Sequence, residues 1–423
     1  RARYPDRDGF VERDGVRIFY EVYGQGARTV LLLPTWSIVH SRHWKLQIPY
    51  LARHARVVTF DGRGNGRSDR PAGVEHYLED EFAADTLAVL DATGTEQATL
   101  VGCSCAALWG TIVAADHPDR VDGIVYIGPA VGLAPGHTDR QQYAFDEEHS
   151  TDEGWAKYNS HFWKRDYRGF LEFFMAQCFS EPHSTKQIED AVGWGLETDP
   201  ETLADTTRAI SLCRTERFRD TVERIRCPVL VIHGDADRIR PHAQGAALAE
   251  ATGGQLVVLE GSGHLPQARD PVKINLLLRE FACPPAPRWT RGRSRRRRAL
   301  FVSSPIGLGH ARRDVAIADE LRRLHPDLEI DWLAQHPVTR VLEQHGERIH
   351  PASAHLASES GHIECESAEH DLHVFGAWRR MDEILLSNFM VFHDLVRDDP
   401  YDLWIGDEAW ELDYFLHENP ELK

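Results

Sequence analysis

The chain has 423 residues, which is more than one hydrophobic core usually holds, so its length predicts two domains. Hydrophobic residues make up 42% of the sequence, but no run reaches the roughly 18 consecutive apolar residues of a membrane-spanning helix, which argues against a membrane protein. The formal net charge of −18 argues against nucleic acid as a partner.

The first third of the chain alternates strand-like and helical segments. Residues 10–23 have the alternating pattern of a β-hairpin, and residues 29–33 form a wholly apolar run typical of a strand buried on both faces. Residues 43–53 predict a helix, and residues 55–60 predict a second buried strand. This strand leads into DGRGNGRSDRP (61–71), whose glycines and aspartates indicate a tight loop.

The next strand carries the first chemical signal. An apolar run at 97–101 leads through Gly102 and Ser104 into a helix-compatible stretch at 107–116. A serine at such a strand-to-helix turn has its hydroxyl clear of the sheet, and the N–H that follows points to where an oxyanion would form. The pattern is G-x-S-x-G except for its last position, which is Ala106. Alone, this near-match also fits a purely structural turn.

Further strand–helix alternation predicts an α/β fold with a mostly parallel sheet covered on both faces. Residues 132–226 interrupt the alternation with helical segments rich in aromatic side chains, so they are predicted to form an insertion between two strands. The remaining segments are strands predicted at 121–127, 228–233 and 255–259, and helices predicted at 242–252 and 272–282.

Two later loops supply the partners that a nucleophilic serine needs. Residues 234–241 contain Asp235 and Asp237 directly after a strand, and residues 260–264 end in His264 directly after the next strand. A serine requires a base to take its proton and an acid to orient that base. The carboxyl ends of parallel strands meet at one edge of a sheet, so we expect these loops to lie close together.

With these motifs, residues 8–283 resemble the α/β-hydrolase family. The resemblance rests on four loops in the family's order, which are DGRGNGRSDRP (61–71), LVGCSCAA (100–107), HGDADRIRP (233–241) and EGSGHLPQARDP (260–271). It implies a nucleophile at Ser104, an acid at Asp237 rather than Asp235, and a base at His264. It also implies an oxyanion hole formed by the N–H groups of Cys105 and Trp36.

The chain departs from the family pattern at the oxyanion turn. Thr35 stands where the family commonly has glycine in a His-Gly turn, and Ala106 and Ala107 replace the glycines after the serine. Either change would crowd the turn or displace a donor, and the loss of one donor costs about 10²–10³ in turnover. A hydrolase-fold binding protein with a relic triad therefore remains an alternative.

The insertion at 132–226 resembles the family's helical cap, which lies over the site and excludes water. Phe170, Phe173 and Phe174 follow the i, i+3, i+4 spacing of one helix face, which predicts packing of the cap against the body. An apolar cap favours a small hydrophobic ester, lactone or thioester, and the sequence does not distinguish among these.

A Pro- and Arg-rich stretch at 284–298 predicts a solvated linker between a first domain at 1–283 and a second at 299–423. In the second domain, residues 299–306 predict a strand, and a Gly-rich turn ending at His310 opens a helix. This arrangement suits phosphate or ligand binding. A nicotinamide fingerprint would need glycine where Arg312 stands.

The stretch SSPIGLGHARRDVAIADEL (303–321) resembles the Rossmann-like N-terminal half of GT-B-type glycosyltransferases. The resemblance implies that His310 deprotonates an acceptor hydroxyl and that Asp407 orients it. The family's nucleotide-sugar-binding half does not fit before Lys423, so we expect this region to be incomplete.

These features predict a serine hydrolase that acts through an acyl-enzyme and is fused to an incomplete glycosyltransferase-like module. The alternatives are a bifunctional protein whose donor-binding half lies beyond Lys423, or a non-catalytic binding protein. The expected partner is a small-molecule substrate, with no cofactor or metal, and the oligomeric state stays open. His362, Cys365, His370 and His373 are interpreted as a solvated loop.

The seven cysteines have neither metal-site spacing nor a disulfide framework. The N-terminal segment shows no apolar signal region. Both features predict a protein of the reducing cytoplasm.

Overall fold

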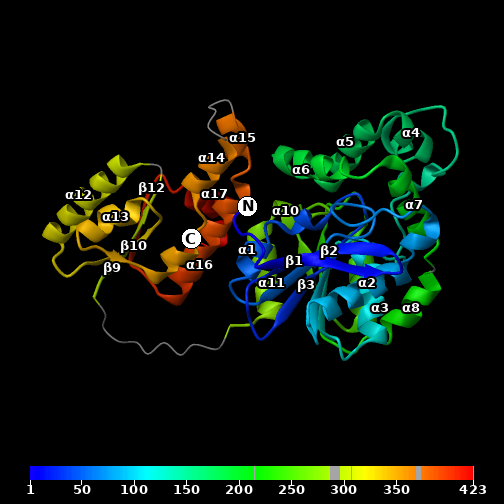
Figure 1. The fold of residues 1–423 in the computed structure, drawn as a ribbon, viewed down its shortest axis with the longest axis horizontal. Helices are drawn as coiled ribbons and strands as arrows, with labels where there is room; N and C mark the ends of the chain where they lie inside the picture. The colour runs from blue at the N-terminus through cyan, green and yellow to red at the C-terminus, as the bar shows by residue number, and fades with distance from the viewer. Residues whose placement is uncertain (214, 286–295, 306, 368–372, 423) are drawn as a thin grey trace. The chain divides into compact units, whose positions relative to one another are not determined.

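The computed structural model describes residues 1–213, 215–285, 296–305, 307–367 and 373–422. The chain divides into two compact units (Figure 1). The large unit is Pro5–Pro284, and the small unit is Pro285–Lys423 together with Arg1–Tyr4. Most of the predicted linker, residues 286–295, lies outside the described residues.

The large unit is built on an eight-stranded sheet with the order β1-β2-β4-β3-β5-β6-β7-β8. β1 and β2 form the predicted hairpin, β2 pairs antiparallel with β4, and the remaining strands are parallel to one another. The prediction of a mostly parallel sheet is therefore confirmed. The strands are β1 (Arg7–Arg13), β2 (Val16–Tyr23), β3 (Thr29–Leu32), β4 (Arg56–Phe60), β5 (Ala98–Cys103), β6 (Val121–Ile127), β7 (Val229–Gly234) and β8 (Gln255–Leu259).

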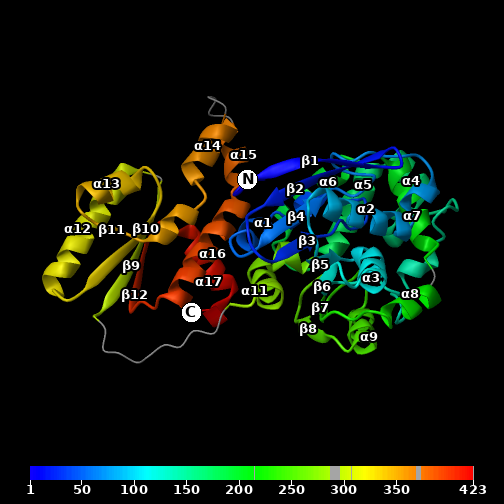
Figure 2. The same ribbon diagram turned by 60° about the horizontal axis from the view of Figure 1, so that its bottom comes forward.

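Helices cover both faces of this sheet, as Figure 2 shows for α11 on one side and α2 and α3 on the other. α1 packs on α11, and α3 packs on α2 and α8. Their bounds are α1 (Ile48–Leu51), α2 (Glu79–Ala92), α3 (Ala106–Asp116), α8 (Thr215–Val222), α9 (His242–Thr252), α10 (Pro266–Arg269) and α11 (Pro271–Ala282).

The helix predicted at 43–53 is wrong in extent. The structure has a 3₁₀ turn at Ser41–Trp44 and a separate four-residue helix α1 that begins at Ile48. Pro49 lies in the first turn of α1, where its missing N–H costs nothing, but it cannot lie inside a longer helix. The proline therefore divides the segment.

Between β6 and β7 the chain forms the predicted helical insertion. Its aromatic side chains pack on one another, with Trp163 and Phe170 fully buried and their ring centroids 4.3 Å apart. Phe174 contacts Trp36 of the loop after β3 at 5.3 Å, so one helix face packs on the body of the unit. Besides α8, the insertion contains α4 (Ser160–Arg165), α5 (Tyr167–Cys178), α6 (Thr185–Gly195) and α7 (Pro200–Ser211).

The small unit has a four-stranded, all-parallel sheet with the order β11-β10-β9-β12. α12 and α13 lie on one face, and α16 and α17 lie on the other (Figures 1 and 2). A Rossmann-like topology for this unit stays a prediction. The elements are β9 (Arg298–Ser303), β10 (Glu329–Ala334), β11 (Arg348–Ile349), β12 (Leu403–Asp407), α12 (Leu308–Leu324), α13 (Val338–Gln344), α14 (Glu359–Ser367), α15 (Val374–Arg379), α16 (Asp382–Asp398) and α17 (Trp410–Glu418).

One prediction for this unit is wrong. Residues 359–367 are the helix α14 rather than a solvated loop, and His362 is buried with its Nε2 2.9 Å from the carbonyl oxygen of Ala377. Contacts with α15 stabilise a helix that its polar composition did not indicate. Among the described residues, no helix is long and apolar enough to cross a membrane.

Candidate active site

Ser104 lies on the turn between β5 and α3, where the backbone is forced into an unusual conformation. Its φ of +55° lies in the left-handed region that non-glycine residues seldom adopt. The strained turn is held on both sides, because the Ser104 N–H donates to the Ile127 carbonyl and the Ser104 carbonyl accepts from the Ala130 N–H. The serine is half-buried, at the carboxyl end of the central strand.

The alanine that replaces the family's glycine fits this turn. Ala106 is fully buried, and a Cβ atom placed on Gly102 would come within 2.9 Å of the Ala106 Cβ. The close approach between β5 and α3 therefore requires a glycine at position 102 and not at position 106. Because Gly102 supplies the space, Ala106 does not obstruct the turn.

The three predicted loops bring their side chains together. His264 Nε2 lies 3.0 Å from Ser104 Oγ, and His264 Nδ1 lies 2.7 Å from Asp237 Oδ2. Since the carboxylate only accepts, Nδ1 carries the proton and Nε2 presents a lone pair to the serine hydroxyl. His264 and Asp237 are each only 3% exposed. Asp235, the other aspartate of that loop, is exposed and accepts from the Gly261 N–H instead.

Asp237 is surrounded by donors. Its Oδ1 accepts from the N–H groups of Ile239 at 2.7 Å and Arg240 at 2.9 Å, and its Oδ2 faces His264 and, at 3.0 Å, His233 Nε2. Burial raises the pKa of Asp237, but the two histidines outweigh burial and hold this pKa well below its ordinary value. The carboxylate therefore stays charged and can orient His264.

His233 is a site residue that the sequence did not single out. It is fully buried at the end of β7, and its Nε2 also lies 3.1 Å from the Arg240 carbonyl oxygen. Both neighbours of Nε2 are acceptors, so Nε2 carries the proton. Nδ1 is buried with no hydrogen-bond partner among the described residues, against Gly245. Its position four residues before Asp237 was the only available signal.

Two N–H groups are free to receive an oxyanion. Within the described part of the chain, neither the Cys105 nor the Trp36 N–H has an acceptor. The Trp36 side chain reaches the insertion, where its Nε1 donates to Thr206 Oγ1 at 2.8 Å. Thr35 is buried, and its hydroxyl has no partner among the described residues.

The small unit also contains a histidine–aspartate pair. His310 Nδ1 lies 2.8 Å from Asp407 Oδ2, at the start of α12 and the end of β12. Unlike the pair in the large unit, this one is shared with Arg313, which contacts Asp407 and lies 2.8 Å from the same His310 nitrogen. A nitrogen that accepts from Arg313 cannot also donate to Asp407, so the two contacts compete. Arg313 was missed, although it lies three residues after His310 on one helix face.

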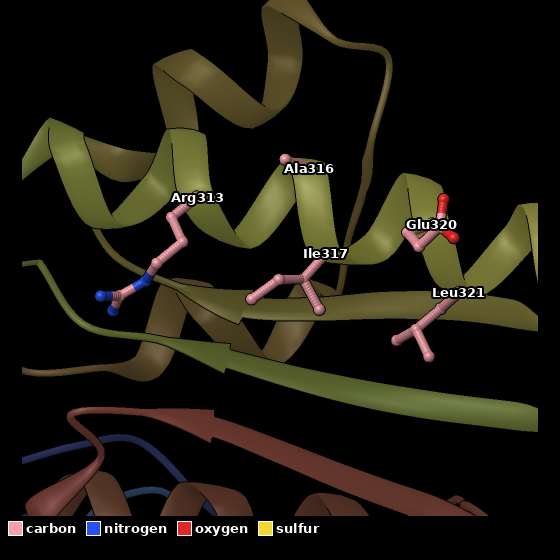
Figure 3. A pocket seen from close by; sticks show the side chains of 5 residues that line it. All are labelled: Arg313, Ala316, Ile317, Glu320 and Leu321. Carbon is pink, nitrogen blue, oxygen red and sulfur yellow. The ribbon is translucent and has the colours of Figure 1, made fainter.

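A hollow in the small unit shares Arg313 with this pair. It measures about 350 Å³ and is lined by Arg313, Ala316, Ile317, Glu320 and Leu321. Figure 3 shows these side chains in a row along α12. Among the described residues, no group of three or more His, Cys, Asp or Glu side chains could hold a metal ion; His370 lies outside them.

Comparison with known proteins supports the α/β-hydrolase fold of the large unit. A family model described as the alpha/beta hydrolase fold matches residues 28–271. The chain is 27% identical over 263 residues to 3-oxoadipate enol-lactonase 2 of Acinetobacter baylyi, covering 62% of this chain and 91% of the relative. The solved structure of Est816, described as an N-acyl homoserine lactone degrading enzyme, is 27% identical with a TM-score of 0.53, covering 64% of this chain and all of that one. The esterase RhEst1 of Rhodococcus is 25% identical with a TM-score of 0.54, covering 65% and 98%.

Proposed function

Since the chain belongs to the α/β-hydrolase fold family, we propose that Ser104, His264 and Asp237 are the catalytic triad of a hydrolase acting on small esters or lactones. The observation that carries this proposal is the continuous chain of contacts, 3.0 Å from Ser104 Oγ to His264 and 2.7 Å from His264 to Asp237. Nucleophile, base and orienting acid each have the partner that their role requires.

In the first half of the reaction, Ser104 Oγ attacks the substrate carbonyl carbon while His264 Nε2 takes the hydroxyl proton. The charge that develops on the carbonyl oxygen is stabilised by the N–H groups of Cys105 and Trp36. His264 then donates its proton to the departing alkoxide, which leaves an ester between Ser104 and the acyl group. Asp237 remains ionised throughout and stabilises the imidazolium.

In the second half, a water molecule loses its proton to His264 and attacks the acyl carbon. The same two N–H groups stabilise the second oxyanion, and the proton returns to Ser104 as the acid departs. The insertion between β6 and β7 serves as a cap, because the Trp36 side chain donates a hydrogen bond to Thr206 of α7 and so connects the oxyanion turn to the insertion. Thioesters remain open to the same chemistry.

The names of the relatives support esters and lactones as the substrate class. They include an enol-lactonase, an N-acyl homoserine lactone degrading enzyme and an esterase. A lactone differs from an open ester only in that its leaving alkoxide stays attached to the acyl group. The same triad therefore serves both.

A fluorophosphonate probe tests the proposal. We expect it to label Ser104, as located by peptide mass spectrometry, and to leave Ser104→Ala unlabelled. A folded protein that remains unlabelled would support the alternative of a non-catalytic binding protein.

For the small unit we propose a glycosyltransferase-like domain in which His310 activates an acceptor hydroxyl, because His310 Nδ1 lies 2.8 Å from Asp407 Oδ2. As a test, 4-nitrophenol is added as a simple acceptor while the imidazole resonances are followed. A change in the His310 signals that disappears in Asp407→Asn supports the assignment, and unchanged signals contradict it.

A further inference from the structure

Two arginines from separate segments meet at the loop that carries Asp237. Arg240 belongs to this loop, and its backbone N–H donates to Asp237 Oδ1 at 2.9 Å. Arg140 comes from the start of the insertion, and its Nη1 donates to the carbonyl oxygen of Ile239 at 3.2 Å. The two guanidinium-bearing residues are therefore tied to adjacent positions of one loop.

Neither arginine has a carboxylate partner within the described part of the chain. The nearest acid, Asp237, already accepts four hydrogen bonds, which is the capacity of a carboxylate. Asp139 accepts from the Arg140 backbone N–H at 3.0 Å and from Trp155 Nε1 at 3.1 Å. The Nε of Arg240 is buried without any hydrogen-bond partner among the described residues.

The environment of these two arginines differs from that of Arg63, an arginine that is fully buried. Arg63 is 1% exposed, and two of its nitrogens each lie 2.7 Å from an oxygen of Asp85. That bidentate pair neutralises the buried charge. Arg140 and Arg240 are half-buried and have no such bidentate partner among the described residues, and a positive charge that is partly removed from water without a partner is costly.

The surroundings of Arg140 are aromatic and reach the residue proposed as an oxyanion donor, Trp36. The Arg140 guanidinium lies 4.8 Å from the ring centre of Tyr158, 5.2 Å from that of Trp155 and 5.9 Å from that of Phe174. The rings of Tyr158 and Phe174 in turn contact the Trp36 ring, with centroid distances of 5.9 Å and 5.3 Å. Arg140 therefore lies one layer of rings from the proposed oxyanion turn.

The two charges also act on each other. Burial lowers the pKa of Arg240, and the neighbouring Arg140 lowers it further. An anion between the two guanidinium groups would relieve this repulsion and supply the missing hydrogen-bond acceptor. A carboxylate matches the planar fork of a guanidinium.

We propose that Arg140 and Arg240 form a carboxylate-binding subsite, so that the hydrolase acts on esters or lactones that carry a second, ionised carboxyl group. This inference rests on the proposed hydrolase function and narrows its substrate class. It also modifies the expectation of a small hydrophobic substrate, because the cationic Arg140 lies among the aromatic rings of the insertion. The competing explanation is that Arg140 only joins the insertion to the loop through its ring contacts.

Two esters that differ only in charge test the subsite. The 4-nitrophenyl monoester of adipic acid has an ionised end group, and 4-nitrophenyl 6-methylheptanoate has the same shape without charge. We expect kcat/KM to favour the charged ester, and the ratio of the two values to fall on the order of 10- to 100-fold in Arg240→Gln and in Arg140→Gln. Ser104→Ala supplies the uncatalysed rate.

Two further variants make the result specific. Arg238 is exposed on the same loop, so Arg238→Gln should keep the ratio of the parent protein. Arg240→Lys keeps the charge but not the fork, so it should retain part of the preference. A ratio that is the same in the parent, Arg240→Gln and Arg140→Gln overturns the proposal.

A binding measurement separates this proposal from the hydrolase proposal. Monomethyl adipate is titrated by calorimetry into Ser104→Ala, with and without Arg240→Gln or Arg140→Gln. At least tenfold weaker binding in either arginine variant upholds the subsite, even if the probe fails to label Ser104 and the hydrolase proposal falls. Binding that does not depend on either arginine overturns the subsite, even if neutral esters are hydrolysed.

Discussion

Two buried carboxyl groups, Asp237 of the large unit and Glu411 of the small unit, have opposite pKa shifts. In the large unit, Asp237 receives four hydrogen bonds, and its pKa is held well below the ordinary value although burial acts to raise it. In the small unit, Glu411 is 8% exposed, and burial, assisted by the nearby Glu359, raises its pKa to about 8. The donors around a carboxylate, rather than its depth, decide whether it is charged at neutral pH.

The two histidine–aspartate pairs also differ in the groups that surround the histidine. His264 has one acid on one nitrogen and one hydroxyl on the other, so its protonation is determined by its neighbours. His310 shares Asp407 with Arg313, and a competing contact reaches the nitrogen that should donate. Contact with an aspartate therefore determines the protonated nitrogen of His264, whereas at His310 the contact with Arg313 leaves it undetermined.

Removing the nucleophile should have the largest effect. Ser104→Ala deletes the atom that forms the acyl-enzyme, so kcat/KM for a 4-nitrophenyl ester should fall by at least about 10⁴-fold. The far-ultraviolet circular dichroism spectrum serves as the control for folding. A decrease of less than tenfold in a folded variant would show that Ser104 is not the nucleophile.

Neutralising the acid should have the next largest effect. Asp237→Asn removes the charge that holds the His264 tautomer, and kcat should fall by about 10³–10⁴-fold. Asp235→Asn is the matched control, because Asp235 is exposed and bonds only to the neighbouring loop; its kcat should change by less than about threefold. Equal losses in both variants would contradict the assignment of Asp237.

The small unit should respond to Glu411→Gln through stability. The folded unit keeps Glu411 protonated to about pH 8, whereas an unfolded chain loses this proton near the ordinary pKa of 4.5. The folded state therefore binds more protons between these values, and the stabilisation is lost as pH rises. Glutamine removes this dependence, so the variant should be more stable by about 5 kcal/mol near pH 9 and nearly unchanged near pH 4.

Hydrogen exchange in the whole chain measures this change. The amides of α16 and α17 should gain protection in Glu411→Gln as the pH is raised, while those of β5 and β7 should not. A gain that is equal at all pH values would show that the carboxyl group does not titrate in this range.

His233 should have a smaller, positional effect on catalysis. Its Nε2–H bonds Asp237 but no reacting atom, so His233→Leu should lower kcat by about tenfold with little change in KM. His233→Gln keeps a donor and should recover part of the loss. Equal kcat values for His233→Leu and His233→Gln would show that His233 contributes through packing and not through its hydrogen bond.

The smallest effect is expected at Ala106. Because its Cβ lies over Gly102, Ala106→Gly should change kcat/KM by less than about threefold and lower the stability by about 1 kcal/mol, since glycine is less favourable in a helix. A large gain in rate would instead show that the alanine distorts the oxyanion turn.

Most of the fold and the order of the three loops could be predicted from the sequence. Short apolar runs such as residues 229–234 predict buried strands, and the residues around Ser104 predict the strand-to-helix turn. Both signals are local properties of the chain. The local pattern gave the wrong extent for the helix at 43–53, where Pro49 divides the segment. It also missed the polar helix α14, which is stabilised by contacts with the next helix, α15.

Tertiary structure alone decided which groups meet. The family resemblance favoured Asp237 over Asp235, but the physical reason is tertiary, because the loop after β8 places His264 against Asp237. Likewise, Arg140 and Arg240 are 100 positions apart, and nothing local to either predicts their meeting. Propensity and periodicity act over a few residues, whereas a site depends on contacts between distant segments that only the packed sheet and its insertion create.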